Sequence, residues 1–256
     1  MTLLFWSLRS VGMTALLVAL PLATGCVGQI DDEPLDDEDP TPIVDPTGDE
    51  SAPGLVLDFT ATWCVNCPRM ATAIEDAARE RPGKVFPVSI HFRDDFSNAA
   101  GEALAKDYGI QAYPSVIVNL DPSTLMTATS KELILAKLDA TAEGRKAACT
   151  LSGSVSGTTL QMAVTASETG TYSLGVLLLE DGIVAPQTGA DGSYVHDNIL
   201  RTILSGTLAG DSLGALDAGA TAQMSYSLNL SPEGSYHIVA YVTDGGLVNS
   251  VVSIPL

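Results

Sequence analysis

The sequence predicts an α/β domain over residues 54–148 followed by an all-β domain over residues 149–256. Three observations lead to this division. Residues 55–70 pass from an apolar run of strand length, through two cysteines in C-x-x-C spacing, into an alanine-rich helical pattern. Helical and strand patterns alternate from there to about residue 148, as in α/β folds. From residue 151, short runs rich in Val, Leu, Thr and Tyr are separated by Gly, Asp, Ser and Pro, as in all-β folds.

The elements of the first domain follow from periodicity and from helix end signals. Helices are predicted over residues 64–81, 97–106 and 129–148. Ser97 is the expected N-cap of the second helix, and Thr129 with Glu132 forms an expected capping box for the third. Strands are predicted over residues 55–59, 85–92, 115–120 and 125–128.

The second domain is expected to be an antiparallel β-sandwich of the immunoglobulin-like kind, because short strands alternate there with turn signals. Candidate strands are residues 159–165, 172–180, 223–230, 236–243 and 248–254. The change of pattern near residue 148 also predicts that proteolysis there releases two stable fragments.

Cys64 and Cys67 are placed for redox chemistry. A cysteine at a helix start faces unpaired N–H groups and the positive end of the helix dipole, which stabilise a thiolate. Cysteines three residues apart on a first helical turn can form a disulfide. We therefore expect Cys64 to attack a substrate and Cys67 to resolve the mixed disulfide. The alternative is a structural disulfide in an oxidising compartment.

These residues resemble the thioredoxin superfamily. Asp58 stands six residues before Cys64, and Trp63 directly precedes it, as the buried acid and the tryptophan do in that family. A second match lies in residues 108–118, where Pro114 occupies the position of the family's cis-proline, which faces the disulfide. The resemblance implies a thioredoxin fold and a redox-active cysteine pair.

Further side chains complete the expected site. Asp58 would accept the proton of Cys67 during resolution; the alternative is a polar residue at a strand end. Tyr113 and Trp63 would line a substrate groove, where the backbone of Tyr113 pairs with an extended substrate; the alternative is a tight turn before a strand. His91 would hold the attacking thiolate as an ion pair, or would be a core or solvent-facing histidine.

No metal ion and no cofactor are expected. The chain has no second C-x-x-C and no H-x-x-H pattern, and its three histidines are spread along the sequence. Cys149 is the odd thiol; we expect it to be buried and inert at the domain junction, with an intermolecular link as the alternative. A cluster of polar residues in the second domain is not expected to be a catalytic triad, because no serine stands in a nucleophile elbow. We expect these residues to form hydrogen bonds with one another at a corner of the sandwich. The members of this cluster are His196, Asp197, Arg201, Glu180 and Asp181.

The N-terminus resembles a bacterial lipoprotein signal. Residues 1–25 carry Arg9 as their only charge, then an apolar core, and end in A-T-G before Cys26. The resemblance implies cleavage before Cys26 and its lipidation; the alternatives are a plain signal peptide or a short membrane anchor. Residues 26–53 are then expected to be an acidic, disordered tether, since residues 28–52 hold ten acids and no base.

A second resemblance lies in the all-β half. Residues 177–187, L-L-L-E-D-G-I-V-A-P-Q, and residues 194–201, Y-V-H-D-N-I-L-R, resemble the C-terminal signatures of one lipoprotein family. These are the thioredoxin-fold outer-membrane lipoproteins related to the 28-kDa outer-membrane protein. The resemblance implies a cell-envelope protein, attached to the outer membrane by its lipid anchor.

The expected function is thiol–disulfide exchange on exported proteins. Its expected partners are protein thiols or disulfides and an unidentified redox partner. The alternative is a non-catalytic surface or outer-membrane lipoprotein in which the disulfide is structural. A thiol accessible at Cys64 would favour the enzyme, and a buried disulfide the binding module. Nucleic acid is not an expected partner, because the 256-residue chain has a net charge of −19 and no basic patch.

Overall fold

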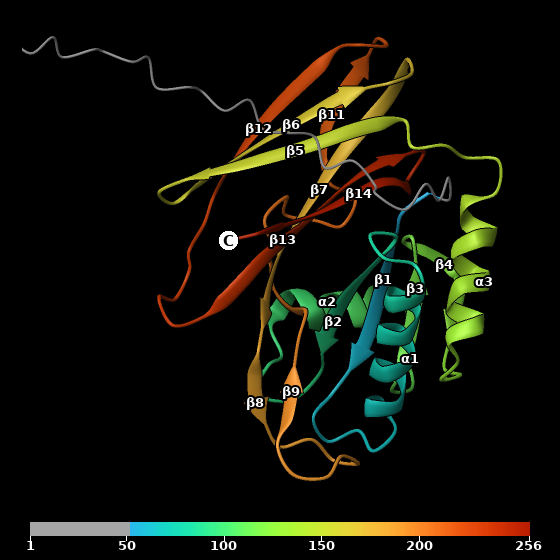
Figure 1. The fold of residues 1–256 in the computed structure, drawn as a ribbon, viewed down its shortest axis with the longest axis vertical. Helices are drawn as coiled ribbons and strands as arrows, with labels where there is room; N and C mark the ends of the chain where they lie inside the picture. Colours follow the sequence, from blue (N-terminus) through green and yellow to red (C-terminus); the bar gives the residue numbers. More distant parts are fainter. Residues whose placement is uncertain (1–51) are drawn as a thin grey trace, which may run out of the picture. The chain divides into compact units, whose positions relative to one another are not determined.

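The computed structural model describes residues 52–256, whose arrangement Figure 1 shows. The predicted signal peptide, Cys26 and the predicted tether up to residue 51 lie outside the described residues. The first half comprises β1 (Gly54–Thr60), α1 (Cys67–Glu80), β2 (Val85–His91), α2 (Ala99–Asp107), β3 (Ser115–Val118), β4 (Asp121–Met126) and α3 (Lys131–Ala142). The second half comprises β5 (Cys149–Ser156), β6 (Thr159–Ala166), β7 (Gly170–Asp181), β8 (Ile183–Ala185), β9 (Tyr194–His196), β10 (Ile199–Ile203), β11 (Asp211–Leu216), β12 (Thr221–Ser227), β13 (Ser235–Asp244) and β14 (Leu247–Pro255).

A nine-stranded mixed sheet runs through both halves of the chain. Its order is β14-β13-β7-β10-β2-β1-β3-β4, and β11 pairs with β7 off this path. β1 is parallel to β2 and antiparallel to β3. The halves meet where β10 runs parallel to β2, with Ile199 opposite Ser89. Backbone pairing thus joins the halves, which argues against the two separable fragments expected from the sequence.

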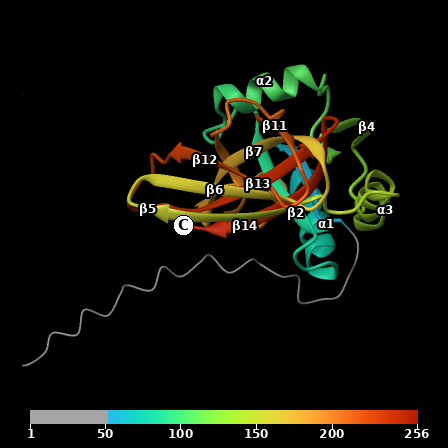
Figure 2. The ribbon, with the colours of Figure 1, turned by 90° about the horizontal axis from the view of Figure 1, so that it is seen from above.

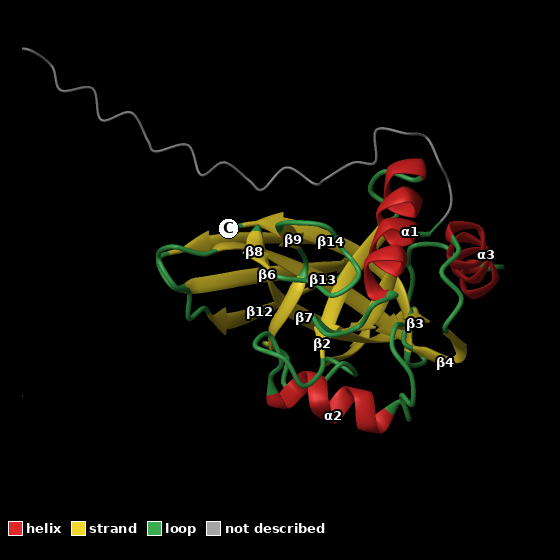
Figure 3. Ribbon diagram, turned by 90° about the horizontal axis from the view of Figure 1, so that it is seen from below, coloured by secondary structure: helices red, strands yellow, loops and turns green. Residues whose placement is uncertain are grey.

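Helices cover both faces of the sheet in the first half. α1 and α3 lie on one face and α2 on the other (Figures 2 and 3). β1 is buried along its whole length, as expected of a central strand covered on both faces. Met70 and Ile134 belong to the core beneath α1 and α3. Leu104 of α2 belongs to a second core that continues into the second half, where it includes Leu179 and Tyr241.

Antiparallel sheets make up the second half. β5, β6 and β12 form a three-stranded sheet, which packs on β7 and β13 through a shared core (Figure 1). Leu160 of β6, Val176 of β7 and Ala240 of β13 belong to that core. The predicted order of an α/β domain followed by a β-rich domain is confirmed. β8 and β9 pair with each other as a hairpin.

Two helix ends of the first half differ from the sequence prediction. α2 is capped by Asn98 rather than Ser97, because the Ser97 hydroxyl is hydrogen-bonded to Asp94. α3 is capped by Ser130, one residue after the expected cap, and ends at Ala142 rather than near residue 148. In both helices a neighbouring polar side chain accepts the bond from a free helix N–H.

The sequence prediction lacks β5 and all four strands from β8 to β11. β8 and β9 are only three residues long, and β11 contains a register shift at Gly214, whose φ is 73°. Strands as short as β8 and β9 or as irregular as β11 carry little periodicity, so their partners rather than their own pattern define them. Within residues 52–256, no helix combines the length and apolar character that a membrane span requires.

Candidate redox site at the start of α1

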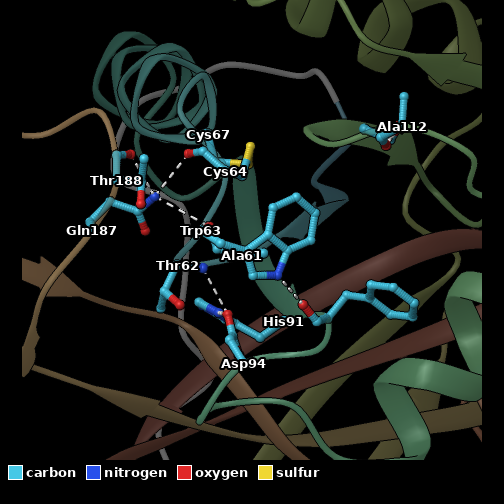
Figure 4. The surroundings of a disulfide bond; sticks show 12 residues. Ala61, Thr62, Trp63, Cys64, Cys67, His91, Asp94, Ala112, Gln187 and Thr188 are labelled. Carbon is cyan, nitrogen blue, oxygen red and sulfur yellow. Dashed lines mark hydrogen bonds and ion pairs between the residues drawn. A yellow bond between two sulfur atoms is a disulfide. The ribbon is translucent and has the colours of Figure 1, made fainter.

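A disulfide joins Cys64 and Cys67 where the chain enters α1 (Figure 4). Their Cα atoms are 5.4 Å apart, and the Cys67 N–H donates to the Cys64 carbonyl oxygen (3.3 Å). α1 begins at Cys67 with Asn66 as its N-cap, so the predicted helix start at Cys64 is wrong. Pro68 explains the difference, because proline lacks an N–H and suits the first turn of a helix. The free N–H groups of the helix therefore begin at the second cysteine.

The disulfide lies just below the protein surface. Cys64 is 4% exposed and Cys67 is 2% exposed. The neighbours Trp63 and Val65 are both exposed, with Trp63 at 48%. A reagent approaching Cys64 therefore meets these two side chains first.

Asp58 on β1 shares a cavity of about 50 Å³ with Cys67. Asp58 is 3% exposed, and its Oδ1 has no hydrogen-bond partner among residues 52–256. Burial disfavours the ionised carboxylate and raises the pKa of Asp58 from 3.8 to about 7. A carboxyl group with this pKa can take up a proton near neutral pH, as the predicted acceptor for Cys67 must.

An aromatic cluster lies beside the disulfide on the exposed side. The Trp63 indole Nε1 donates to the Phe92 carbonyl oxygen (3.0 Å), and its ring packs edge-on against Tyr113, with centroids 5.5 Å apart. Tyr113 stacks on Phe92 at 5.1 Å, and the Arg93 guanidinium lies over the Phe92 ring at 4.8 Å. Tyr113 also packs on the small cluster that contains both cysteines. The structure thus brings Trp63 and Tyr113 together at the disulfide.

The peptide bond between Tyr113 and Pro114 is cis. Both residues line a groove of about 370 Å³ that also includes Asn66 of the C-x-x-C turn and Thr129 of the loop before α3. The groove reaches the C-x-x-C turn, where the sequence places a substrate groove. Its use by a substrate stays a prediction.

His91 lies in the cavity with Cys67 and not on the exposed face with Trp63. Its Nδ1 is hydrogen-bonded to Asp94 Oδ2 (2.7 Å), which also accepts from the Thr62 N–H (2.8 Å). Burial opposes ionisation of Asp94, but hydrogen bonds from His91 and backbone N–H groups, with the His91 charge, outweigh it and lower the Asp94 pKa to about 2. The pair therefore fixes the turn before Cys64, and an ion pair between His91 and Cys64 stays a prediction.

The second half of the chain supplies a strap over the cysteine turn, defined as residues 187–190 of the β8–β9 loop. Gln187 Nε2 donates to the carbonyl oxygens of Ala61 (3.2 Å) and Cys64 (3.0 Å), as Figure 4 shows. The Thr188 N–H donates to the Thr62 carbonyl oxygen (2.8 Å). A Cβ atom at Gly189 would lie 2.1 Å from the Val65 carbonyl oxygen, so only glycine fits there.

The polar corner predicted for the second half divides into two places. Arg201 Nε donates to Glu180 Oε2 (2.6 Å), and Asp181 accepts from the Asn198 N–H (2.7 Å). These contacts form the expected hydrogen-bonded corner. His196 instead lines the cavity with Asp58 and Cys67.

Sequence reasoning missed the contribution of Gln187 and His196 to this site. Both lie far along the chain from the cysteines, and no local spacing links them. Their only sequence signal was their position in residues 177–187 and 194–201, the two segments with a family resemblance.

The remaining thiol and the titratable clusters add no metal site. Cys149 is buried and unpaired, and burial together with the Asp244 charge raises its pKa to about 11. Among residues 52–256, no group of His, Cys, Asp and Glu side chains is arranged to hold a metal ion.

Solved structures share this fold. HBP35 of Porphyromonas gingivalis superposes with a TM-score of 0.62 at 21% identity, covering 80% of this chain and 76% of its own. A structural-genomics protein of Agrobacterium tumefaciens gives a TM-score of 0.57 at 15% identity, covering 80% of this chain and 95% of its own. At these identities the likeness concerns the fold alone.

Two family matches cover the described residues. Residues 49–140 match the Thioredoxin family. Residues 101–254, more than half of the chain, match the family described as Outer membrane protein Omp28. The chain belongs to the Omp28 family. The Omp28 match begins at α2 in the α/β half and continues through the β-rich half. It therefore spans both of the halves that contribute strands to the shared sheet.

Curated relatives of this Omp28 protein match its thioredoxin-like part. Thioredoxin H4 of Arabidopsis thaliana is 32% identical over 68 residues, 27% of this chain and 52% of that protein. Probable thioredoxin-2 of Caenorhabditis elegans is 36% identical over 67 residues, 26% of this chain and 42% of that protein. The chain spans about half the length of the curated relatives it matches. Family, fold and disulfide together define a thioredoxin-like protein of the cell envelope.

Proposed function

We propose that this protein carries out thiol–disulfide exchange on exported proteins, with Cys64 as the attacking thiol and Cys67 as the resolving thiol. One observation carries the proposal: the disulfide lies next to a buried carboxyl group, Asp58, which shares a cavity with Cys67 and has a pKa of about 7. A structural disulfide would not need an unpaired buried acid, which is costly to keep. The groove at Tyr113 and Pro114 offers a place for an extended substrate.

The reaction balances as two exchange steps. In the reducing direction, the Cys64 thiolate attacks a substrate disulfide, forms a mixed disulfide and displaces one substrate thiolate. Cys67 then gives its proton to Asp58 and attacks Cys64 Sγ. This second step forms the Cys64–Cys67 disulfide and releases the other substrate sulfur as a thiolate, which then takes up a proton from Asp58 or solvent. The substrate gains two electrons and the protein loses two; a dithiol partner restores the reduced protein, and the reverse sequence oxidises a substrate.

Burial of the cysteines favours a second possibility, in which the protein is a non-catalytic envelope protein and the disulfide only stabilises its fold. Cys64 is only 4% exposed and the strap is hydrogen-bonded to its carbonyl oxygen. A structural disulfide of this kind resists reduction and does not react with substrates.

Reduction of insulin by dithiothreitol distinguishes the two functions. We expect the full chain to accelerate the precipitation of the insulin B chain, and Cys64→Ser and Cys67→Ser to abolish the acceleration. Cys149→Ser is the matched control, because this buried thiol lies outside the site, and it should retain full activity. Wild-type protein that leaves the reaction at its background rate would refute the oxidoreductase and favour the structural staple.

We further propose that a lipid on Cys26 anchors the protein in the envelope. The support is the A-T-G-C ending of an apolar signal and the Omp28 family match. Cells grown with labelled palmitate should yield labelled protein, and Cys26→Ala should remove the label. Unlabelled wild-type protein in the soluble fraction would contradict the anchor.

A further inference from the structure

The cavity behind the disulfide has walls from both halves of the chain. Asp58 of β1, Cys67 of α1 and His91 of β2 come from the first half. Tyr194 and His196 come from β9 of the second half. Its volume of about 50 Å³ is enough for one or two water molecules.

Two buried polar atoms in this cavity lack partners. Asp58 Oδ1 and His196 Nε2 have no hydrogen-bond partner among residues 52–256, and His196 is 5% exposed. In a neutral imidazole one ring nitrogen carries the proton and the other can accept one, so a neutral His196 offers Nε2 as an acceptor in the tautomer protonated at Nδ1. Buried polar atoms normally have partners, so this pair of acceptors calls for a function.

The His196 ring is held firmly in place. Its centroid lies 4.8 Å from that of Tyr194, 4.9 Å from that of Phe96 and 5.5 Å from that of His91, all in edge-on geometry. Burial, and next the His91 charge, lower the pKa of His196 below its ordinary value of 6.5. This shift favours the neutral imidazole, which is the form able to accept a proton.

Other titratable groups face the same space. Cys67 and Glu75 lie on α1, and His91 lies on β2. Asp94 does not line the cavity but is hydrogen-bonded to His91. On the side of the second half, Tyr194 lies on β9 and Asp197 follows it. Of these groups, Glu75 and Asp197 are exposed to solvent, and both line the cavity.

We infer that His196 is a second proton acceptor for the Cys67 thiol, acting through this cavity beside Asp58. The inference rests on the proposed exchange reaction. During resolution the Cys67 S–H bond breaks, its proton passes through cavity water to Asp58 or His196, and the thiolate attacks Cys64 Sγ. The acceptor later releases the proton to solvent or to the departing substrate thiolate. The β-rich half thus takes part in the chemistry of the thioredoxin-like half.

Stopped-flow reaction of the reduced full chain with dithiobis(nitrobenzoate) separates the two exchange steps. All variants carry Cys149→Ser, which removes the third thiol. Attack by Cys64 releases the first thionitrobenzoate at a rate that depends on reagent concentration. Attack by Cys67 releases the second at a rate independent of reagent. The first release tests the proposed function, and the second tests the role of His196.

His196→Gln should leave the first release within twofold and change the pH dependence of the second. With Asp58 as the only acceptor, the rate of the second release should depend on the ionised fraction of Asp58, whose pKa is about 7. That rate should therefore fall about tenfold between pH 8 and pH 6. With His196 present, the fall in the rate of the second release between pH 8 and pH 6 should be smaller, because burial lowers the His196 pKa below its ordinary value and keeps a neutral imidazole available as an acceptor. Added imidazole should restore the second release in His196→Ala but not in His196→Gln, which fills the space.

His237→Gln is the matched control, since His237 comes from the same half but is bound to Asp181 (2.6 Å) and does not line the cavity. A second release that is the same in wild type and His196→Gln from pH 6 to pH 8 would overturn the inference while leaving the proposed function intact. A missing first release would refute the proposed function.

A titration of the reduced wild type decides the inference without any substitution at His196 or any activity. The ¹³Cβ shift of Cys67 should change at the pH at which the His196 ring nitrogens titrate, because groups in one cavity titrate together. A Cys67 shift that shows no inflection at that pH would overturn the inference.

Discussion

Asp58 lowers the stability of the folded protein while providing the proton acceptor of the proposed reaction. It stands in the middle of a fully buried strand, and no described residue satisfies its Oδ1. Burial makes the ionised carboxylate unfavourable and raises the pKa of Asp58 to about 7, so the carboxyl group stays protonated below that pH. A residue that costs stability at a position where an apolar side chain would fit is best explained by a use in the reaction.

Replacing Asp58 with Asn should stabilise the oxidised protein at pH 8 and have little effect near pH 4. The folded carboxyl titrates at about 7 and the unfolded one at 3.8, so wild type loses stability as the pH rises through that interval. The interval corresponds to at most about 4 kcal/mol. Urea unfolding at several pH values measures the difference. An exposed carboxyl, Asp95, provides the control as Asp95→Asn, and a gain for Asp58→Asn that does not depend on pH would contradict the explanation.

Cys149 should be the slowest thiol in the reduced, folded protein. Its pKa of about 11 leaves only about one thiolate in a thousand at pH 8. Iodoacetamide should therefore modify Cys64 long before Cys149, as mass spectrometry of quenched samples can follow. In protein unfolded in guanidinium, Cys64 and Cys149 should be modified at similar rates. Equal modification of Cys64 and Cys149 in folded protein would show that Cys64 has no special reactivity.

At the scale of elements, the β8–β9 hairpin is the unexpected part of the site. Its loop bonds the C-x-x-C turn through Gln187 and Thr188, and its second strand places His196 in the cavity. The hairpin has few ladder bonds of its own, being three residues long on each side. Its position therefore depends on bonds to other elements, among them those of the strap, and we expect the strap to limit access to Cys64.

Gly189→Ala should loosen the strap and expose the disulfide. Its φ of +87° and the 2.1 Å approach to the Val65 carbonyl oxygen leave no room for a methyl group. We expect a loss of more than about 1 kcal/mol in stability and faster reduction of the disulfide by dithiothreitol. Gly192 has a similar φ of +73° with nothing within 4 Å, so Gly192→Ala is the matched control. Equal reduction rates in both variants would mean that the strap does not shield Cys64.

At the scale of the molecule, one sheet and one core join the two halves. β10 pairs with β2, and the core beneath α2 includes Leu57 and Val88 from the first half and Leu177 and Val239 from the second. Cutting the chain between the halves would expose this apolar surface to water.

Limited proteolysis should therefore leave residues 52–256 as one protected unit. Even if a protease cuts the segment between α3 and β5, the two pieces should stay associated, because the β2–β10 pairing and the shared core persist. Size-exclusion chromatography of the cut protein, followed by mass spectrometry, measures this. Two fragments that elute separately and remain folded would restore the independent domains expected from the sequence.

The sequence by itself determined the local parts of this protein. The buried strand before the cysteines, the helix after them, Asp58 at its spacing and Pro114 in its motif are all properties of short segments. Apolar periodicity and helix end signals act over one or two turns, so these features can be read from neighbouring residues. Even here the helix start moved from Cys64 to Cys67, because the first turn depends on Asn66 and Pro68 as well.

Only the tertiary structure decided how the two halves combine. Ile199 pairs with Ser89, Gln187 bonds Cys64, and His196 enters the cavity of Cys67 across more than a hundred residues of chain. The strands involved are short and nearly aperiodic, so their own residues favour no particular partner. Their placement follows from the burial of apolar surface in the core that both halves share. The free energy of that burial depends on contacts across the whole chain and cannot be assigned to one segment.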